Sequence, residues 1–175
     1  MDLGAFTGAG EVTELSKWNC KAVWLCLLGI LLGIGNVLSQ PCLFVRAAGE
    51  IAAITPAYKG TPVSIRFIHS VQKTPVLENL AVAADGQGLL LHSTKYQSFG
   101  VGLPFLASEG SFHEEGDYFV FDHMERYFPK LTLRTGVGTK LTLYLRGQEY
   151  PLYEKYPPGT AIDIFVSPFG KGMLL

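Results

Sequence analysis

His69 and Glu78 are the residues whose types and positions could do chemistry in this sequence. They fall in two predicted strands, residues 63–70 and 76–82, where apolar and polar residues alternate with the two-residue period of a β-strand. Both His69 and Glu78 lie on the apolar face of their strand. An antiparallel register with His69 opposite Glu78 brings the two apolar faces together. We therefore predict that both polar side chains face the core and each other.

This His–Glu pair has two interpretations. In the structural one, the two side chains bond each other and set the register of the hairpin and its loop around Pro75, since buried polar groups are usually hydrogen-bonded. In the functional one, the pair lines a cleft, where it acts as general acid and base or binds a ligand. Ser70 does not complete a hydrolase triad with His69, because adjacent strand residues point to opposite faces.

A second motif, residues 98–104, places Ser98, Gly100 and Gly102 in one short stretch. Glycines at this spacing permit tight turns or a close approach of the backbone to a partner. The motif is not a dinucleotide-binding fingerprint, because Phe105 stands where a third glycine is required. It predicts either a bulged loop that ends a strand or a loop that packs beside the His69 hairpin and shapes a pocket.

Other chemistry is not indicated. Residues 113–117 and 122–123 concentrate His, Asp and Glu, but at no spacing typical of zinc or calcium sites, so we predict a solvated acidic loop. No nucleophile elbow, phosphate-binding loop or Cys pair occurs. We therefore expect no cofactor, no metal and no enzymatic activity. An exported hydrolase built on His69 and Glu78 would lack a nucleophile.

The elements that position these residues are predicted to be strands. Short apolar runs alternate with turn signals between residues 51 and 166, which indicates an all-β domain: an antiparallel sandwich or small barrel of roughly eight to nine short strands. The cleanest alternation, residues 140–145, is followed by a turn at 146–147 and a return strand, a hairpin expected to be structural. Only Asp122–Phe128 is expected to be briefly helical.

An apolar segment precedes this domain. No charged residue occurs from Ala22 to Val45, and about 20 apolar residues suffice for a helix to cross a bilayer. We predict a cytoplasmic tail at residues 1–21, a transmembrane signal anchor at 22–42 and an extracytoplasmic β-domain at 43–175. A cleaved signal peptide is the alternative, although its apolar region is usually shorter, about 7–15 residues.

Charged flanks predict the orientation of this segment. Lys17 and Lys21 precede it, a bias that places the N-terminus in the cytoplasm and the β-domain in the periplasm or outside the cell. Inside the segment, Gly29 and Gly33 lie four residues apart. Small residues at this spacing let a second transmembrane helix approach closely, either from a partner or in a homodimer.

Charge and cysteine content exclude two further classes of protein. From Arg46 onward the chain has 12 Lys and Arg against 12 Asp and Glu, so it lacks the basic surface of proteins that bind nucleic acid. The three cysteines, Cys20, Cys26 and Cys42, lie in or beside the apolar segment. The β-domain therefore contains no internal disulfide and depends on its core for stability.

Two motifs carry a resemblance to a known family. The first motif, residues 67–78, runs Phe-Ile-His-Ser-Val and then Thr-Pro-Val and Glu, and the second is residues 98–104. In order and spacing, the two motifs together resemble the bacterial domain-of-unknown-function family numbered 1850. The likeness covers roughly residues 45–166. Members of that family are small exported or membrane-anchored proteins, typically encoded beside tripartite ATP-independent periplasmic (TRAP) transporters of the TAXI type, whose substrate-binding protein is extracytoplasmic.

The resemblance implies which residues characterise the family. Its His and Glu correspond to His69 and Glu78, and its glycines to Gly100 and Gly102. Residues 1–21 depart from the pattern, because family members have a shorter N-terminus. That difference argues against a cleaved signal peptide in this chain.

The resemblance also implies a function near such a transporter. We expect a membrane-anchored, non-catalytic accessory subunit of a TRAP-type solute transporter. Gly29 and Gly33 would face the transporter's membrane subunit, and the β-domain would face the substrate-binding protein or a ligand. The alternative is an extracytoplasmic ligand- or metal-binding module that uses His69 and Glu78.

Overall fold

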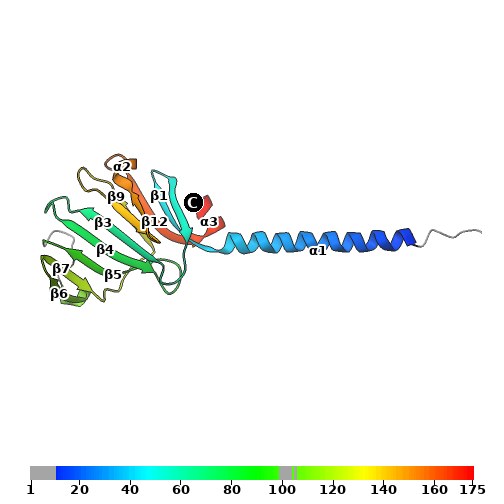
Figure 1. Ribbon diagram of the computed structural model, residues 1–175, viewed down its shortest axis with the longest axis horizontal. Coiled ribbons are helices and arrows are strands. Elements are labelled where there is room, and N and C mark those ends of the chain that lie inside the picture. The colour runs from blue at the N-terminus through cyan, green and yellow to red at the C-terminus, as the bar shows by residue number, and fades with distance from the viewer. Residues whose placement is uncertain (1–10, 99–103, 105) are drawn as a thin grey trace, which may run out of the picture. The chain divides into compact units, whose positions relative to one another are not determined.

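The computed structural model describes residues 11–98, 104 and 106–175, with backbone alone at 11–19 and 107. The chain divides into two compact units (Figure 1). One ends at Ser39 and consists of a long helix, and the other, Gln40–Leu175, is a β-domain.

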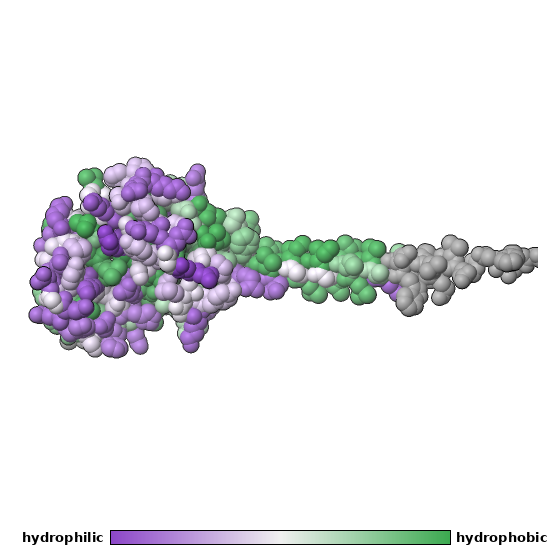
Figure 2. Space-filling view, viewed as in Figure 1, coloured by the Kyte–Doolittle hydropathy of each residue, from purple (hydrophilic) through white to green (hydrophobic). Residues whose placement is uncertain are grey.

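Helix α1 (Glu11–Ser39) contains one segment, Cys20–Ser39, that is long and apolar enough to cross a membrane, a property shared by membrane anchors and signal sequences. The large apolar side chains between Val23 and Leu38 are 44–71% exposed, and Figure 2 shows the apolar surface that they form. The helix ends three residues earlier than the predicted segment. Pro41 cannot continue the helical hydrogen bonds, and strand β1 begins there.

The β-domain has two antiparallel sheets, which confirms the predicted all-β fold behind an apolar N-terminal helix. The described residues form twelve strands rather than eight to nine. In order across the four-stranded sheet these are β2 (Glu50–Pro56), β1 (Pro41–Ala47), β12 (Ala161–Pro168) and β9 (Lys130–Arg134). The larger sheet has the order β11 (Gln148–Pro151), β10 (Thr142–Leu145), β3 (Pro62–Ile68), β4 (Pro75–Val82), β5 (Leu89–Tyr96), β7 (Tyr118–Asp122) and β6 (Ser111–Glu115), with β8 (Arg126–Phe128) paired to β5.

The core lies between the two sheets, as in a sandwich (Figure 1). Val45 of β1 and Ile164 of β12 come from one sheet, and Ile65 of β3 and Leu143 of β10 come from the other; all four are 0–1% exposed. Along β3, the buried Val63 and Ile65 alternate with less buried residues, so the two-residue period of that strand corresponds to an inner and an outer face.

The predicted hairpin is confirmed in β10 and β11, where Leu143 pairs with Tyr150. Arg146 and Gly147 form its two-residue turn, with φ of 50° and 81°. Positive φ at both central residues is typical of the turn that matches the twist of a two-stranded hairpin. Glycine adopts this conformation without a steric penalty, which explains Gly147 at the second position.

The expected short helix at Asp122–Phe128 is wrong. Arg126–Phe128 forms β8, in which Tyr127 pairs with Leu90 of β5. Pairing to a strand that is already in place outweighs the weak local helical preference of this segment.

A short helix, α3 (Phe169–Leu174), packs on the outer face of the four-stranded sheet. Phe44 and Phe165 stack on that face with ring centroids 5.4 Å apart, and Phe169 packs against them. Gly172 lies directly on the Phe44 ring, where a Cβ atom would overlap the ring carbons. Strand β1 is thus buried on both faces.

We expect Gly172→Ala to lower the free energy of unfolding of the β-domain by about 1–3 kcal/mol, because the added methyl group overpacks the contact with Phe44. Equilibrium urea unfolding of the intact chain measures this change. Met173→Ala, at a side chain that is 47% exposed, is the control and is expected to change stability by less than about 0.5 kcal/mol. Equal stability of Gly172→Ala and the parent would contradict the close contact.

Candidate functional site

The register of β3 and β4 differs from the predicted one. Glu78 lies opposite Ile65, not opposite His69. The predicted register, with Ile65 opposite Val82, is wrong by four residues. Because four is an even number, every side chain keeps its predicted face. The prediction of inward-facing residues therefore holds, whereas the His69–Glu78 pair does not form.

A tight turn explains this register. The His69 amide donates to the Thr74 carbonyl at 2.8 Å, and the Lys73 amide donates to the His69 carbonyl at 2.9 Å. The reversal therefore needs only residues 70–73, and strand pairing begins at Ile68 with Pro75. The predicted register would have required a longer loop, with fewer backbone hydrogen bonds satisfied.

His69 itself stabilises the turn. Its side chain is buried, at 7% exposed. The Nδ1 atom accepts hydrogen bonds from the amides of Val71 and Gln72, at 3.3 and 3.1 Å. These amides have no strand partner, so the imidazole replaces one, much as an Asn or Asp side chain does in an Asx turn. This geometry uses Nδ1 for structure.

Replacing His69 separates a structural role from a chemical one. We expect His69→Ala to lower the free energy of unfolding by about 1–3 kcal/mol, because two turn amides lose their acceptor. In His69→Asn, the amide oxygen can take the place of Nδ1, and we expect most of the loss to be recovered. Urea unfolding of the intact chain measures both. If His69→Asn is as unstable as His69→Ala, the turn bonds are not the reason for this histidine.

The start of the second motif lies beside this turn. The Ser98 hydroxyl donates to Oε1 of Gln72 at 3.4 Å, and Gln72 is one of the two residues that His69 binds. Ser98 thus contacts the His69 turn, and the packing of the loop at residues 98–104 beside that turn stays a prediction. Gly100 and Gly102 lie outside the described residues.

Tyr96 connects the far end of the same motif to the core. It is fully buried at the end of β5, and its hydroxyl donates to the Pro104 carbonyl at 2.5 Å. Burial, followed by the negative charge of Glu109, raises the pKa of the Tyr96 hydroxyl above its ordinary value. The hydroxyl therefore keeps its proton at neutral pH and donates it to the hydrogen bond with the Pro104 carbonyl.

Glu78 stands apart from the His69 turn, on the inner face of β4. It pairs with Ile65 of β3 and Thr94 of β5 and is half-buried. Within the described residues its carboxylate makes no hydrogen bond or ion pair. Burial raises the pKa of Glu78, and the positive charge of Arg126 only partly opposes this. Glu78 is therefore a partly desolvated carboxyl that has no bonded partner among the described residues.

A small pocket adjoins this region. Its volume is about 250 Å³, and its walls include Met124 and Arg126. The Thr94 hydroxyl, next to Glu78 on β5, donates to the Met124 sulfur at 3.7 Å. The remaining lining residues are Ser108, Glu109 and Glu125. The pocket thus combines hydrogen-bonding groups with both signs of charge.

His69 and Glu78 are too far apart to hold one ion. His69 lies opposite Thr74, and Glu78 is four residues further along the chain, about 13 Å at the rise of a strand. No three His, Cys, Asp or Glu side chains within the described ranges gather as a metal site requires. Sequence reasoning missed Tyr96, Thr94 and Arg126. A tyrosine on an apolar strand face needs an acceptor, and this signal could have identified Tyr96.

The raised pKa of Glu78 predicts that the stability of the domain falls with rising pH. Because its pKa is raised on folding, the folded domain holds the proton more tightly than the unfolded chain does. Stability therefore falls as the pH rises from the ordinary glutamate value through the raised folded value. We expect Glu78→Gln, neutral and of the same shape, to stabilise the domain by about 1–2 kcal/mol at neutral pH.

Urea unfolding between about pH 4 and pH 8 tests this expectation. The difference between Glu78→Gln and the parent should shrink toward zero at the acidic end. Glu50→Gln, at an exposed residue of β2, is the control for removing one negative charge. A Glu78→Gln variant that is less stable than the parent at neutral pH would show that the carboxylate has a stabilising partner.

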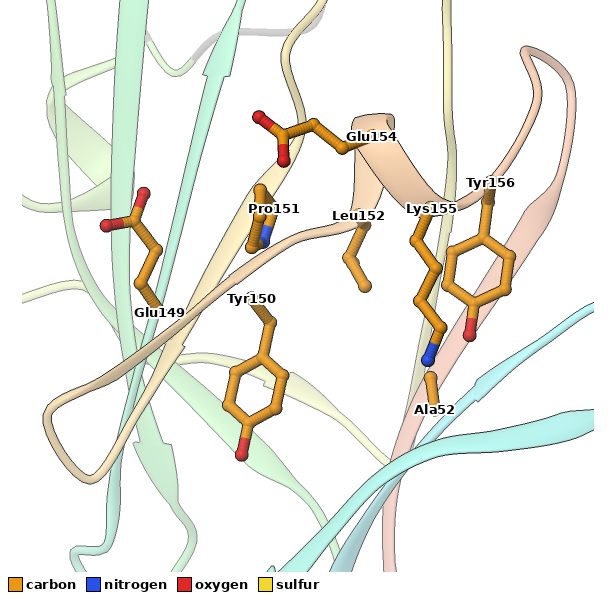
Figure 3. A pocket seen from close by; sticks show the side chains of 8 residues that line it. All are labelled: Ala52, Glu149, Tyr150, Pro151, Leu152, Glu154, Lys155 and Tyr156. Atoms are coloured by element: carbon orange, nitrogen blue, oxygen red, sulfur yellow. The ribbon is translucent and has the colours of Figure 1, made fainter.

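A second pocket, also about 250 Å³, lies between β2, β11 and the short helix α2 (Leu152–Lys155) (Figure 3). Figure 3 shows the Lys155 side chain running along the Tyr156 ring, with its Nζ 5.6 Å from the ring centroid. Both rim carboxylates accept hydrogen bonds from tyrosine hydroxyls, Glu149 from Tyr144 and Glu154 from Tyr153. The other lining residues are Ala52, Tyr150, Pro151 and Leu152. None of the residues predicted from the sequence lines this pocket.

Comparison with protein families matches residues 63–152 to the domain of unknown function DUF1850. The chain belongs to the DUF1850 family. The matched part of this DUF1850 protein runs from β3 to β11 and includes His69, Glu78 and Tyr96. Strands β1, β2 and β12 lie outside it, so most of the smaller sheet is not part of the match. No curated protein and no solved structure matches the chain.

Proposed function

We propose that this DUF1850 protein is a membrane-anchored, non-catalytic accessory subunit of a TRAP-type solute transporter of the TAXI class. The observation that carries the proposal is an apolar helical segment, Cys20–Ser39, whose large side chains are exposed and which the β-domain follows directly in the chain. Such a helix needs lipid or another helix around it. The link to this transporter class comes from the family resemblance.

The state of His69 supports a non-catalytic role. A general base must present an unprotonated nitrogen to the substrate. In His69 the accepting nitrogen, Nδ1, takes hydrogen bonds from two backbone amides, so the neutral ring carries its proton on Nε2. Glu78 is separated from it along the sheet. The most specific sequence motif therefore works as a fold-determining turn, which fits a subunit that binds other proteins.

The glycine pair offers a contact to the transporter's membrane subunit, or to a second copy of this chain. A Cβ atom added at Gly29 or Gly33 would meet nothing within 4 Å, so this side of α1 is open to a close neighbour. Lys17 and Lys21 before the span favour a cytoplasmic N-terminus, which puts the β-domain on the side of the substrate-binding protein.

Affinity purification of the intact chain in mild detergent tests the proposal. We expect a TRAP membrane subunit or its substrate-binding protein to copurify, and to be lost from Gly29→Leu with Gly33→Leu. Leu27→Ile with Leu31→Ile, on the opposite side of the helix, is the matched control that should retain the complex. Purification without any transporter subunit, where other membrane complexes survive, would refute the proposal.

A second candidate function is a ligand-binding module of the β-domain. The observation in its favour is the half-buried Glu78 carboxyl, which has no bonded partner among the described residues and feels the charge of Arg126, a lining residue of the pocket. Because His69 lies elsewhere, such a site would use Glu78 without it. Loss of ligand-dependent thermal stabilisation in Glu78→Gln, with retention in His69→Asn, would support this function. Identical ligand responses in the parent and Glu78→Gln would exclude it.

A further inference from the structure

A pocket of about 480 Å³ lies on the outer face of the four-stranded sheet, beside α3. Its charged walls come from four elements: Arg46 of β1, Lys130 of β9, Asp163 of β12 and Lys171 of α3. The remaining lining residues are Gly49, Pro129, Phe165, Val166, Ser167 and Leu175. Three basic side chains thus surround one acidic side chain in a single hollow, on a domain whose overall charge is balanced.

One of the three cations is already neutralised. Lys130 Nζ lies 2.8 Å from Oδ2 of Asp163, and the Thr132 hydroxyl donates to Oδ1 at 2.7 Å. Burial raises the pKa of Asp163, but these hydrogen bonds and the charges of Lys130 and Arg46 outweigh it and hold the pKa below its ordinary value. Asp163 is therefore ionised and committed to Lys130.

Arg46 has donors that nothing in the described chain accepts. Its Nη2 donates to the Gly172 carbonyl at 3.3 Å, a long bond to a neutral group. Its Nε is buried and without a partner, which is rare for a guanidinium that has been taken partly out of water. Arg46 lies opposite Asp163 in the strand pair, but that carboxylate is already held by Lys130 and Thr132.

Lys171 adds a second uncompensated charge. Its side chain is exposed and makes no hydrogen bond or ion pair among the described residues. The Gly172 carbonyl, which binds Arg46, follows Lys171 in α3, so the two cations border the same wall. A lysine that makes no ion pair among the described residues, beside an arginine that keeps an unsatisfied buried donor, favours a ligand that carries one or two negative charges.

We propose that this pocket binds an anionic group of the phosphate class, a phosphate monoester or a phosphodiester, held by Arg46 and Lys171. A guanidinium presents paired N–H donors that match two oxygens of such a group, and an ammonium supplies a point charge beside it.

Two sources of this group fit the site, a soluble phosphate and the headgroup of an anionic lipid. The Phe169 amide at the start of α3 donates to the Gln40 carbonyl at 2.8 Å. Gln40 directly follows Ser39, the last residue of α1. The start of α3 is therefore hydrogen-bonded to the residue that follows the apolar helix in the chain. The lipid source rests on the proposed membrane anchor, whereas phosphate binding by the pocket does not.

The first experiment titrates inorganic phosphate into the intact chain in neutral detergent at constant ionic strength, followed by calorimetry. The second compares the chain in nanodiscs of zwitterionic lipid with nanodiscs that also contain phosphatidylglycerol, and measures protection of the Lys171 amine from acylation. In Lys171→Gln we expect at least about tenfold weaker phosphate binding, because a charged donor is lost. Lys171→Arg should restore it.

Lys155→Gln is the control, since it removes an exposed lysine outside this pocket. Saturable binding of phosphate alone supports the site with a soluble ligand, and protection by phosphatidylglycerol supports it with a lipid. The absence of both, or an equal loss in Lys155→Gln and Lys171→Gln, overturns the proposal. Failure of the chain to stay in membranes would refute the anchor, while the phosphate titration would still decide the pocket.

Discussion

Tyr96→Ala is expected to lower the free energy of unfolding of the β-domain by about 3–5 kcal/mol, the range for removing a large buried aromatic ring. Tyr96 is 0% exposed at the end of β5. Its ring packs near Phe119, with centroids 5.9 Å apart, and its hydroxyl binds the Pro104 carbonyl. The substitution therefore leaves a cavity and removes the bond that holds Pro104 to the sheet.

Equilibrium urea unfolding of the intact chain measures this loss. The signal should be near-ultraviolet circular dichroism of the tyrosines, because both tryptophans, Trp18 and Trp24, precede the β-domain. Tyr96→Phe is the matched control, since it keeps the ring and removes only the hydroxyl. It is expected to cost about 0.5–1.5 kcal/mol, the net value of one hydrogen bond. If Tyr96→Ala costs no more than Tyr96→Phe, the ring does not fill the core as described.

Placing two arginines in α1, as Leu28→Arg with Leu31→Arg, is expected to abolish stable membrane association. Each arginine near the centre of a span costs about 2.5–3.5 kcal/mol on the insertion scale, whereas each Leu, Ile or Val contributes about 0.3–0.6 kcal/mol in favour. Ten of the residues from Ala22 to Leu38 are of these three types. Two arginines therefore cancel the whole gain of the segment.

Membrane fractionation after alkaline carbonate extraction measures this effect. The parent is expected in the membrane pellet with its N-terminal residues intact, as shown by mass spectrometry. Leu28→Ile with Leu31→Ile controls for substitution at the same two positions. A mature parent chain that begins after Ser39 would identify α1 as a cleaved signal sequence. Retention of the double arginine variant in the pellet would mean that something other than α1 anchors the chain.

The alternation of apolar residues predicted the inner faces of β3 and β4 correctly. Val63, Ile65, Val76 and Leu80 are all buried. The register was wrong because alternation is unchanged by a shift of an even number of residues. What selects among such registers is the turn, and the turn depends on hydrogen bonds from backbone amides to His69, which alternation does not describe.

In the candidate site, too, the sequence predicted the burial of residues but not their partners. His69 and Glu78 were both singled out because they are polar residues on apolar strand faces, and both are indeed partly or fully buried. Their partners were not predictable in this way. Arg126 reaches the region of Glu78 because β8 pairs with β5. That pairing was not predicted, because the segment that contains β8 was expected to be helical.

The sequence alone determined the local properties of this protein: an apolar helix long enough for a bilayer, strands with a two-residue period, and a hairpin with its turn at Arg146 and Gly147. These follow from the types of neighbouring residues. The tertiary structure alone decided which strands pair, that His69 holds a turn while the Glu78 carboxylate has no bonded partner among the described residues, and that Arg46 and Lys171 line one pocket. Such contacts join residues far apart in the chain, and they depend on how two sheets and a terminal helix pack rather than on any local pattern.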